Sequence, residues 1–237
     1  MESPSTLVNT ADPRQDVHKE RKHDPNLNRY RVAESLLPPD PRGLRVLELG
    51  GGIGELSRRM TAKGIDVTFV DLSEHNILKA REMGLEAHRL DLNQGLPPFG
   101  DGMFDGVVML EIIEHVVAAE ALLDEVYRVL KPGGFLILST PNFAFFLNRF
   151  KILLGGLSGD EGYHYRFFTV RSLGRQLRNA GFRLERSAHT MPAFGVNIIR
   201  NRILKRPRAH LHVPGLVAPL LAHTLIVKAI KSSGNRS

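Results

Sequence analysis

The stretch VLELGGGIGELS, residues 46–57, joins an apolar run to a helical pattern through a turn rich in glycine. The apolar run predicts a buried strand, and the residues after the turn predict a helix. Gly50, Gly52 and Gly54 let the backbone turn sharply and approach a ligand closely. The free amides at the start of the helix would point toward that ligand. This unit favours an α/β fold with a ligand at the glycine turn.

Strands and helices alternate through the middle of the chain. Strands are expected at 44–49, 66–71, 85–91, 104–110 and 134–140, and helices at 28–37, 54–63, 73–84, 118–130 and 170–181. Two closing strands are expected at 182–190 and 223–230. Continuous apolar strands between short helices imply a sheet covered on both faces. We therefore predict a doubly wound, mostly parallel sheet of seven strands.

The ends of the chain depart from this rhythm. Residues 1–27 are polar and rich in proline, so we expect a mobile arm before a single domain at 28–237. No basic start followed by an apolar stretch is visible, which favours a cytoplasmic setting. Residues 209–227 lack charged side chains, but Pro214 and Pro219 interrupt them, so a transmembrane helix is not expected.

An insertion at about 143–166 follows the fifth predicted strand and is too long for an ordinary connection. It contains four phenylalanines: Phe143, Phe145, Phe146 and Phe150. Open α/β sheets bind ligands beyond the carboxyl ends of their strands, which favours a helical, aromatic lid or substrate wall. The alternative is an ordinary helix packed on the core.

The net charge of +7 is concentrated near the C-terminus. Residues up to Glu185 hold 23 basic and 25 acidic side chains, a balance of −2, whereas the nine charged residues after Glu185 are all Lys or Arg. Such a region is a solvated basic face, or a patch for an anionic substrate, a membrane surface or nucleic acid. No RNA-binding aromatic motif accompanies it, so nucleic acid is the less favoured partner.

The stretch LEIIEHV, residues 110–116, places two carboxylates and an imidazole within five positions. Glu111, Glu114 and His115 would converge if the segment turned helically. Without cysteine in the chain, carboxylate and imidazole are the strong metal ligands left, and this set suits Mg²⁺ or another divalent cation. His164 could be a fourth ligand. The alternatives are acid–base chemistry, or polar groups bonded locally to the backbone.

The glycine turn does not fit the common nucleotide-binding patterns. A nicotinamide dinucleotide motif beginning at Gly50 would have glycine or alanine at position 55, where the chain has Glu55, and the lysine of a phosphate-binding loop is absent. Glu48, just before the glycines, is a poor neighbour for a pyrophosphate but a good one for a cation.

The motif ELGGGIG, followed by Asp71 after the second strand and Asp91 after the third, resembles the class I S-adenosylmethionine-dependent methyltransferases, of type 11 and type 12. FDGVVMLEIIEHV and VLKPGGFLILSTPN also match in order and spacing, so the resemblance covers about residues 28–190. It implies a Rossmann-like fold and S-adenosylmethionine as cofactor. The ExxEH spacing is further similar to two metal-using branches, the ubiquinone-biosynthesis O-methyltransferases and the small-RNA 2′-O-methyltransferases.

The resemblance also assigns cofactor-binding positions after the first four strands. It implies that Gly50 and Gly52 hold the methionine end of the cofactor, with Glu48 near its amine. It implies that Asp71 binds the ribose hydroxyls and that Asp91 with Leu92 frames the adenine. Leu110, which ends the fourth strand, would border the sulfonium methyl. The residues at or beside these positions are Glu48, Gly50, Gly52, Asp71, Leu72, Asp91, Leu92 and Leu110.

Methyl transfer from this cofactor needs mainly alignment of the acceptor and removal of one proton. A hydroxyl acceptor benefits from a general base. His115 lies next to the expected methyl, and His164 lies in the insertion where the acceptor is expected; both are candidate catalytic residues. The competing role for each is a structural one, bonded to the backbone.

These inferences predict O-methylation of a small-molecule acceptor of natural-product, quinone or glycan type. The apolar insertion favours an apolar or lipid-like acceptor and is compatible with peripheral membrane contact. Two alternatives stay open: an RNA methyltransferase that uses the basic C-terminal region, and a non-catalytic family member that binds the cofactor. The oligomeric state does not follow from the sequence.

Overall fold

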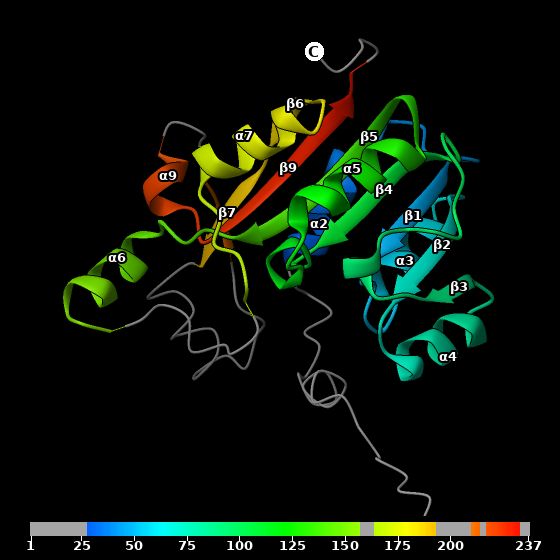
Figure 1. Ribbon diagram of the computed structural model, residues 1–237, viewed down its shortest axis with the longest axis horizontal. Helices are drawn as coiled ribbons and strands as arrows, with labels where there is room; N and C mark the ends of the chain where they lie inside the picture. Colours follow the sequence, from blue (N-terminus) through cyan, green and yellow to red (C-terminus); the bar gives the residue numbers. More distant parts are fainter. Residues whose placement is uncertain (1–27, 157–163, 193–209, 214–216, 233–237) are drawn as a thin grey trace, which may run out of the picture.

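The structure, a computed structural model, describes residues 28–156, 164–192, 210–213 and 217–232. The arm expected at 1–27 and part of the insertion, 157–163, lie outside these residues. The described residues form one sheet of nine strands, with helices on both faces (Figure 1). The strand order is β3-β2-β1-β4-β5-β9-β7-β8, and β6 also pairs with β9.

The strands are β1 (Arg45–Leu49), β2 (Asp66–Asp71), β3 (Glu86–Arg89), β4 (Phe104–Leu110), β5 (Leu130–Pro141), β6 (Phe182–Ser187), β7 (His189–Pro192), β8 (His210–Val213) and β9 (Thr224–Lys231). The helices are α2 (Asn28–Leu36), α3 (Glu55–Thr61), α4 (Glu74–Glu82), α5 (Ala119–Val129), α6 (Phe146–Leu153), α7 (Val170–Asn179) and α9 (Ala218–Leu221). Two short 3₁₀ turns follow β3 and β4: η1 (Leu92–Gln94) and η2 (Ile113–His115).

Strands β1 to β5 are parallel to one another, and β9 runs antiparallel between β5 and β6. The carboxyl ends of the five parallel strands therefore meet at one edge of the sheet, called here the carboxyl edge. The predicted doubly wound, mostly parallel fold is confirmed in this part of the chain.

The parallel strands are apolar along their length because both faces of the sheet are covered. In β1 and β4, Val46 and Val108 pack into one apolar cluster, whereas Leu47, Leu49 and Met109 pack into another. Successive side chains of a strand point to opposite faces, so these two clusters lie on the two sides of the sheet.

Each face is closed by helices that bury an apolar stripe. On the face of Leu47, α5 and α7 bury residues such as Leu122 and Leu173. On the face of Val46, α2 and α3 bury Tyr30 and Leu56. The expected start of α7 is confirmed: the hydroxyl of Thr169 accepts a hydrogen bond from the backbone N–H of Ser172, which caps the helix.

The sheet differs from the expected one at its antiparallel end. The strand expected at 182–190 is divided into β6 and β7, and the pairing of β6 with β9 shifts register between Leu184 and Arg186. The short strand β8 was not expected, because only its pairing with β7 identifies it as a strand. None of the helices in the described ranges is both long and apolar enough to cross a bilayer.

Candidate cofactor and acceptor site

The glycine turn begins where β1 reaches the carboxyl edge. Gly50, Gly52 and Gly54 all have φ between +58° and +77°, the left-handed region that side chains other than glycine rarely adopt. The N–H of Gly50 donates to the carbonyl of Val70 at 2.7 Å, which ties the turn to β2. A side chain at position 50 would overlap that of Ile112, so the glycine turn lies directly against the LEIIEHV stretch.

Glu48 points from β1 into the buried region under the glycine turn. Only 4% of its surface is exposed, and its carboxylate accepts a hydrogen bond from the Ser57 hydroxyl of α3. Burial raises the pKa of Glu48 to about 8, with a smaller rise from the charge of Asp71, although the Ser57 hydrogen bond opposes the rise. The group is thus mostly protonated at neutral pH, and a bound cation would favour its ionised form.

Asp71 ends β2 with its carboxylate already held by neighbouring donors. One oxygen accepts from the backbone N–H of Gly52 at 2.9 Å, and the other accepts from the N–H of Ser73 at 2.8 Å and the side-chain amide of Asn76 at 3.1 Å. These bonds fix the carboxylate between the glycine turn and α4. Leu72, next in the chain, is partly buried.

Asp91 and Leu92 follow β3 at the same edge. The carboxylate of Asp91 caps η1, accepting from the backbone N–H of Asn93 at 3.0 Å and from its side-chain amide at 2.9 Å. Leu92 packs against the core from the loop, and Leu110, which ends β4, is partly buried on the face of α2. The expected cofactor positions therefore follow the ends of β1 to β4 along one edge.

Glu111 does not join the other residues of its motif. Its φ of +57° is in the left-handed region, which costs a residue with a side chain about 1 kcal/mol. Its N–H donates to the carbonyl of Ser139 at 3.0 Å, and its carboxylate accepts from the Ser139 hydroxyl at 2.6 Å. The side chain is thus turned toward β5. The 3₁₀ turn begins only at Ile113, so Glu111 is not part of the helical turn that the spacing suggested.

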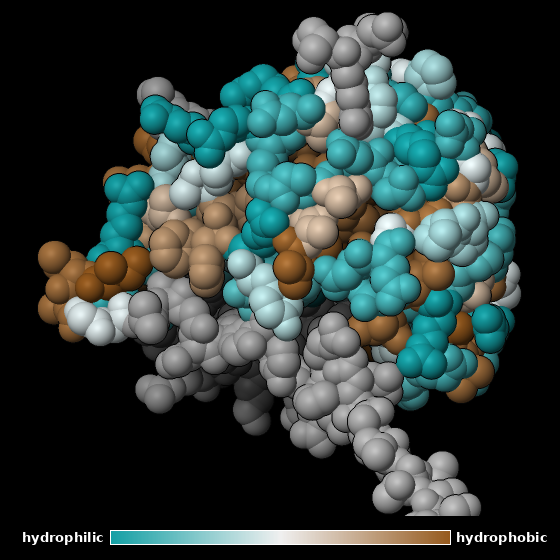
Figure 2. Space-filling view, viewed as in Figure 1, coloured by the Kyte–Doolittle hydropathy of each residue, from teal (hydrophilic) through white to brown (hydrophobic). Residues whose placement is uncertain are grey.

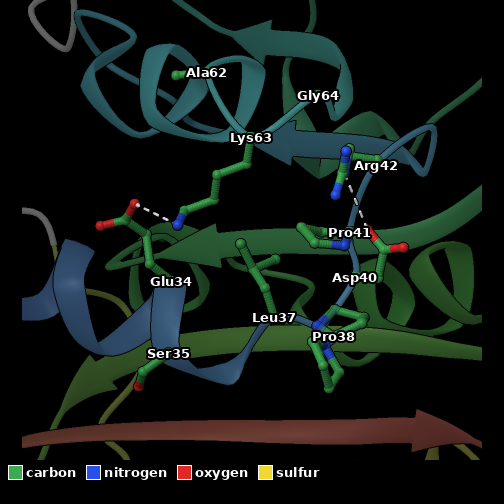
Figure 3. A pocket seen from close by; sticks show the side chains of 11 residues that line it. Glu34, Ser35, Leu37, Pro38, Asp40, Pro41, Arg42, Ala62, Lys63 and Gly64 are labelled. Carbon is green, nitrogen blue, oxygen red and sulfur yellow. Dashed lines mark ion pairs between the residues drawn. The ribbon is translucent and has the colours of Figure 1, made fainter.

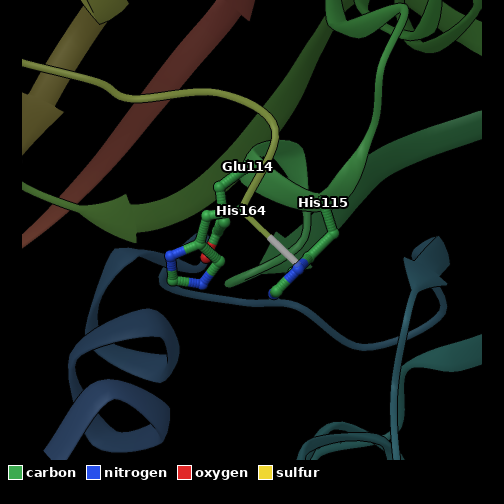
Figure 4. A group of neighbouring side chains, drawn as sticks. All are labelled: Glu114, His115 and His164. Atoms are coloured by element: carbon green, nitrogen blue, oxygen red, sulfur yellow. The ribbon is translucent and has the colours of Figure 1, made fainter. Parts of the chain in front are cut away.

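Glu114, His115 and His164 do come together (Figure 4). One potential ligand atom of each lies within 4.8 Å of the other two, and the two imidazole rings are 4.7 Å apart between centroids. His164 is held there because the next two residues, Tyr165 and Arg166, donate backbone hydrogen bonds to the carbonyl of Glu114 at 2.9 and 3.2 Å. The structure thus brings the two predicted histidines together beside one buried carboxyl group.

Glu114 is the buried member of this cluster, with 2% of its surface exposed. One carboxyl oxygen accepts from the Thr140 hydroxyl at 3.0 Å, whereas the other has no hydrogen-bond partner within the described part of the chain. Burial raises the pKa of Glu114 well above its usual range, and the charge of Glu111 adds to the rise. An unsatisfied buried oxygen beside two histidines is a ready acceptor for a proton or a cation.

Arg29 at the start of α2 was missed by the sequence analysis. Its positive charge opposes the rise in the pKa of Glu114, and its buried Nε has no hydrogen-bond partner among the residues that the structure describes. Burial raises the pKa of the adjacent Tyr30, Arg29 opposes this rise, and the charge of Glu48 adds to it. The electrostatic effect of Arg29 links α2 to η2, and no local pattern in NRYR signals it.

The insertion is only partly a packed element. Phe145 is buried, and the rings of Phe143 and Phe167 lie 4.7 Å apart, but no residue of α6 is buried. Of the phenylalanines expected in the wall, Phe143 thus contacts Phe167, which follows the insertion, while α6 projects from the end of the molecule (Figure 1). A role as a lid stays a prediction.

The basic C-terminal region is described only in part. Lys228 is nearly buried and forms an ion pair with Glu185 at 2.9 Å, and Lys231 donates to the carbonyl of Leu130 at 2.7 Å. Both of these cations therefore have partners within the fold. Six of the nine cations after Glu185 lie outside the described residues: Arg200, Arg202, Lys205, Arg206, Arg208 and Arg236.

A surface hollow of about 650 Å³ lies at the amino end of the parallel strands, opposite the carboxyl edge (Figure 3). Its charged side chains pair with one another, Lys63 with Glu34 at 3.9 Å and Arg42 with Asp40 at 3.4 Å. None of the predicted cofactor or acceptor residues lines it. The hollow is therefore separate from the candidate site.

Comparison with known proteins agrees with this geometry. A family model described as a methyltransferase domain matches residues 19–187. The ubiquinone biosynthesis O-methyltransferase of Xanthomonas axonopodis pv. citri (strain 306) is 34% identical over 156 residues, which are 62% of this chain and 65% of that enzyme. The chain thus matches a little less than two thirds of that relative's length.

Solved structures show the same fold. An S-adenosylmethionine-dependent methyltransferase of Thermotoga maritima has a TM-score of 0.63 and 25% identity, covering 86% of this chain and 87% of that one. The 1,6-didemethyltoxoflavin-N1-methyltransferase of Burkholderia thailandensis, solved with S-adenosylhomocysteine, has a TM-score of 0.56 and 21% identity, covering 86% and 78%. The family resemblance of the ELGGGIG motif is thereby confirmed. The chain belongs to the methyltransferase-domain family, that is, to the class I S-adenosylmethionine-dependent methyltransferases.

Proposed function

We propose that this protein transfers the methyl group of S-adenosylmethionine to an oxygen atom of a small-molecule acceptor. The observation that carries the proposal is the direct packing of the glycine turn against Ile112, which joins the cofactor edge to the cluster of Glu114, His115 and His164. The relatives named as ubiquinone biosynthesis O-methyltransferases support oxygen as the methylated atom.

The residues at the carboxyl edge fit the cofactor. S-adenosylmethionine supplies an electrophilic methyl group on a sulfonium. We assign Glu48 to the cationic amine, because a buried carboxyl group gains most from a cation. Asp71 is fixed at the end of β2, where its oxygens retain acceptor capacity for the ribose hydroxyls. Asp91 with Leu92 frames the adenine, and Leu110 borders the reacting methyl.

One imidazole of the cluster acts as the general base in this proposal. An acceptor hydroxyl loses its proton as the new carbon–oxygen bond forms, so a nearby neutral imidazole lowers the barrier. His115 and His164 both lie beside Glu114, whose carboxylate would stabilise the imidazolium that results. We assign the base to His164, since it lies on the segment that also carries Phe167 of the aromatic wall.

The same cluster also fits a divalent cation. With Glu111 outside the group, the ligand set is one carboxylate and two imidazoles, a mixture that suits Zn²⁺, Mn²⁺ or Fe²⁺ better than Mg²⁺. An ion held there would lower the pKa of an acceptor hydroxyl. Activity after treatment with a chelator separates the two mechanisms. Full activity would exclude a catalytic ion, whereas a loss of activity that Mn²⁺ or Zn²⁺ reverses would favour the ion over the imidazole base.

Labelled methyl transfer tests the function directly. The protein is incubated with extracts of the source organism and S-adenosylmethionine that carries a labelled methyl group. We expect label in a small organic molecule, bound as a methyl ether that resists mild base. Label in RNA, or no label with any fraction although the cofactor binds, would contradict the proposal.

A further inference from the structure

The helix α6 presents apolar side chains to solvent. Its Leu153 is 81% exposed, the adjoining Leu154 is 70% exposed and Phe150 is 58% exposed, with Ile152 exposed between them. Figure 2 shows these hydrophobic atoms gathered on the projecting end of the molecule over α6. Singly exposed leucines are normal on a protein surface, but four large apolar side chains within five positions indicate a contact surface.

The residues just before α6 pack against those just after α9. The residue before α6, Phe145, packs its ring 5.3 Å from that of His223, which follows α9, and the side chain of Asn142 donates to the carbonyl of Ala222 at 2.7 Å. On α9 and the residue before it, Leu220 and Val217 are exposed. We call the exposed apolar residues of these two helices the apolar tip: Phe150, Ile152, Leu153, Leu154, Val217 and Leu220.

Helices α6 and α7 carry exposed cations. Arg149 and Lys151 are exposed on α6, which has no acidic residue. Helix α7, which contacts α9, buries Leu173 and Leu177 on one side and exposes a row of arginines on the other: Arg171, Arg175 and Arg178. Like charges at i and i+4 destabilise a helix slightly, and α7 contains no acidic side chain to offset them.

We propose that the end of the molecule formed by α6, α9 and α7 docks on a lipid bilayer that contains anionic headgroups. The apolar tip enters the boundary between headgroups and acyl chains, and the cations of α6 and α7 contact the lipid phosphates. Aliphatic side chains at the tip gain free energy from burial in lipid, whereas a nucleic acid would offer them no comparable apolar surface.

A second copy of the chain fits this surface less well. In a two-fold dimer the same patch contacts itself, so Arg149, Lys151 and the arginines of α7 would face their own copies. Like charges across an interface oppose association, whereas anionic headgroups neutralise them. The charge of the surface therefore favours the bilayer.

The docking surface adjoins the candidate acceptor site in the fold. Helix α6 follows the carboxyl end of β5 after four residues, and the same end of β5 carries Thr140, which bonds to Glu114. A docked protein would hold the carboxyl edge near the bilayer. Docking on a bilayer does not depend on the proposed acceptor chemistry.

Vesicle flotation of the full chain tests the inference. We expect the protein to float with vesicles of phosphatidylcholine and phosphatidylglycerol, and to float much less with phosphatidylcholine alone. Replacing Leu153 and Leu154 together by Glu should weaken binding by about tenfold or more. Replacing Arg171 and Arg175 together by Glu should weaken binding to the anionic vesicles by about tenfold or more.

Helix α4 offers matched controls at the opposite end of the sheet (Figure 1). Its Leu78 and Lys79 are also exposed, so Leu78→Glu and Lys79→Glu make the same kinds of change away from the docking surface. They should leave flotation nearly unchanged. Equal losses from the α4 and α6 variants, or no binding to either kind of vesicle, would overturn the inference. A third result would also overturn the inference: a dimer in light scattering that dissociates when Leu153 and Leu154 are replaced, with no binding of either the dimer or the monomer to vesicles.

Discussion

At the residue scale, we expect Glu48 to couple cofactor binding to the release of a proton. Its pKa of about 8 means that the free protein carries this carboxyl mostly protonated at neutral pH. If the carboxylate pairs with the ligand amine, binding must release that proton. The affinity for S-adenosylhomocysteine should therefore rise with pH below about 8, approaching tenfold per pH unit. Calorimetry in buffers of different ionisation enthalpy measures both the affinity and the protons released.

Glu48→Gln is the matched variant for this measurement. It keeps the size of the side chain but cannot ionise, so binding should be weaker and nearly independent of pH over the same range. An affinity of the unaltered protein that stays constant between pH 6 and pH 8, with no proton release, would show that Glu48 does not meet the amine.

His164 is expected to contribute through proton removal rather than cofactor binding. His164→Ala should lower the rate of methyl transfer by about 10²- to 10⁴-fold and leave the affinity for S-adenosylhomocysteine unchanged. His75, an exposed histidine on α4, provides the control, and His75→Ala should have no effect on the rate. A His164→Ala enzyme with a normal rate, together with a slow His115→Ala enzyme, would move the assignment to His115.

At the scale of elements, the glycine turn restricts which side chains the backbone can carry. Gly50 has a φ of +68°, and a methyl group there would also overlap Ile112. Gly84, after α4, has a φ of +78° but no heavy atom within 4 Å of an added methyl group. The two positions therefore separate backbone strain from steric overlap.

Gly84→Ala should lower the free energy of unfolding by about 1 kcal/mol, the cost of the left-handed conformation alone. Gly50→Ala should cost about 2 kcal/mol or more and weaken S-adenosylhomocysteine binding, because Ile112 must also move. Adding Ile112→Ala should recover part of the lost affinity. Urea unfolding and calorimetry measure these quantities, and equal stability losses at the two positions would contradict the described packing.

The elements that sequence patterns predicted are those fixed by local rules. The parallel strands are buried on both faces, as with Val46 and Leu47 in β1, so their apolar runs mark them directly. The start of α7 is fixed by the Thr169 cap. The division of β6 from β7 and the presence of β8 depend on pairing between distant segments, which no local pattern encodes.

The candidate site was predictable to a similar extent. Glu48 and Asp71 could be placed together because parallel strands end at one edge, and the bond from Gly52 to Asp71 agrees with that placement. The turn of the Glu111 side chain toward Ser139 depends on a single left-handed residue, and the electrostatic effect of Arg29 on Glu114 depends on how α2 packs. Neither is visible in residue spacing.

At the scale of the whole molecule, burial of Glu48 links stability to pH. A carboxyl group whose pKa is about 8 when folded and 4.5 when unfolded binds protons more tightly in the folded state. Its contribution to stability is fully present below about pH 4.5 and is lost as pH rises through about 8. Glu114 acts in the same direction.

The free energy of unfolding should therefore fall between about pH 5 and pH 8 in the free protein, by a few kcal/mol from Glu48 alone. Urea unfolding across this range measures the slope. In Glu48→Gln the slope should be clearly smaller. A slope that is the same in both proteins would indicate that Glu48 is ionised in the free fold.

The two edges of the sheet have different chemical characters. Salt bridges at the amino edge, such as Arg42 with Asp40, pair charges with each other, whereas the carboxyl edge holds buried carboxyls with oxygens that retain acceptor capacity. We propose that this carboxyl edge binds S-adenosylmethionine. Strand β2 carries an aspartate at each of its ends, Asp66 and Asp71.

Calorimetric titration with S-adenosylhomocysteine tests where the cofactor binds. The unaltered protein is compared with the Asp71→Ala and Asp66→Ala variants of the full chain. We predict one bound ligand per chain, an affinity about a hundredfold weaker in Asp71→Ala, and an unchanged affinity in Asp66→Ala. No binding by the unaltered protein, or equal affinities of the two variants, would contradict the account.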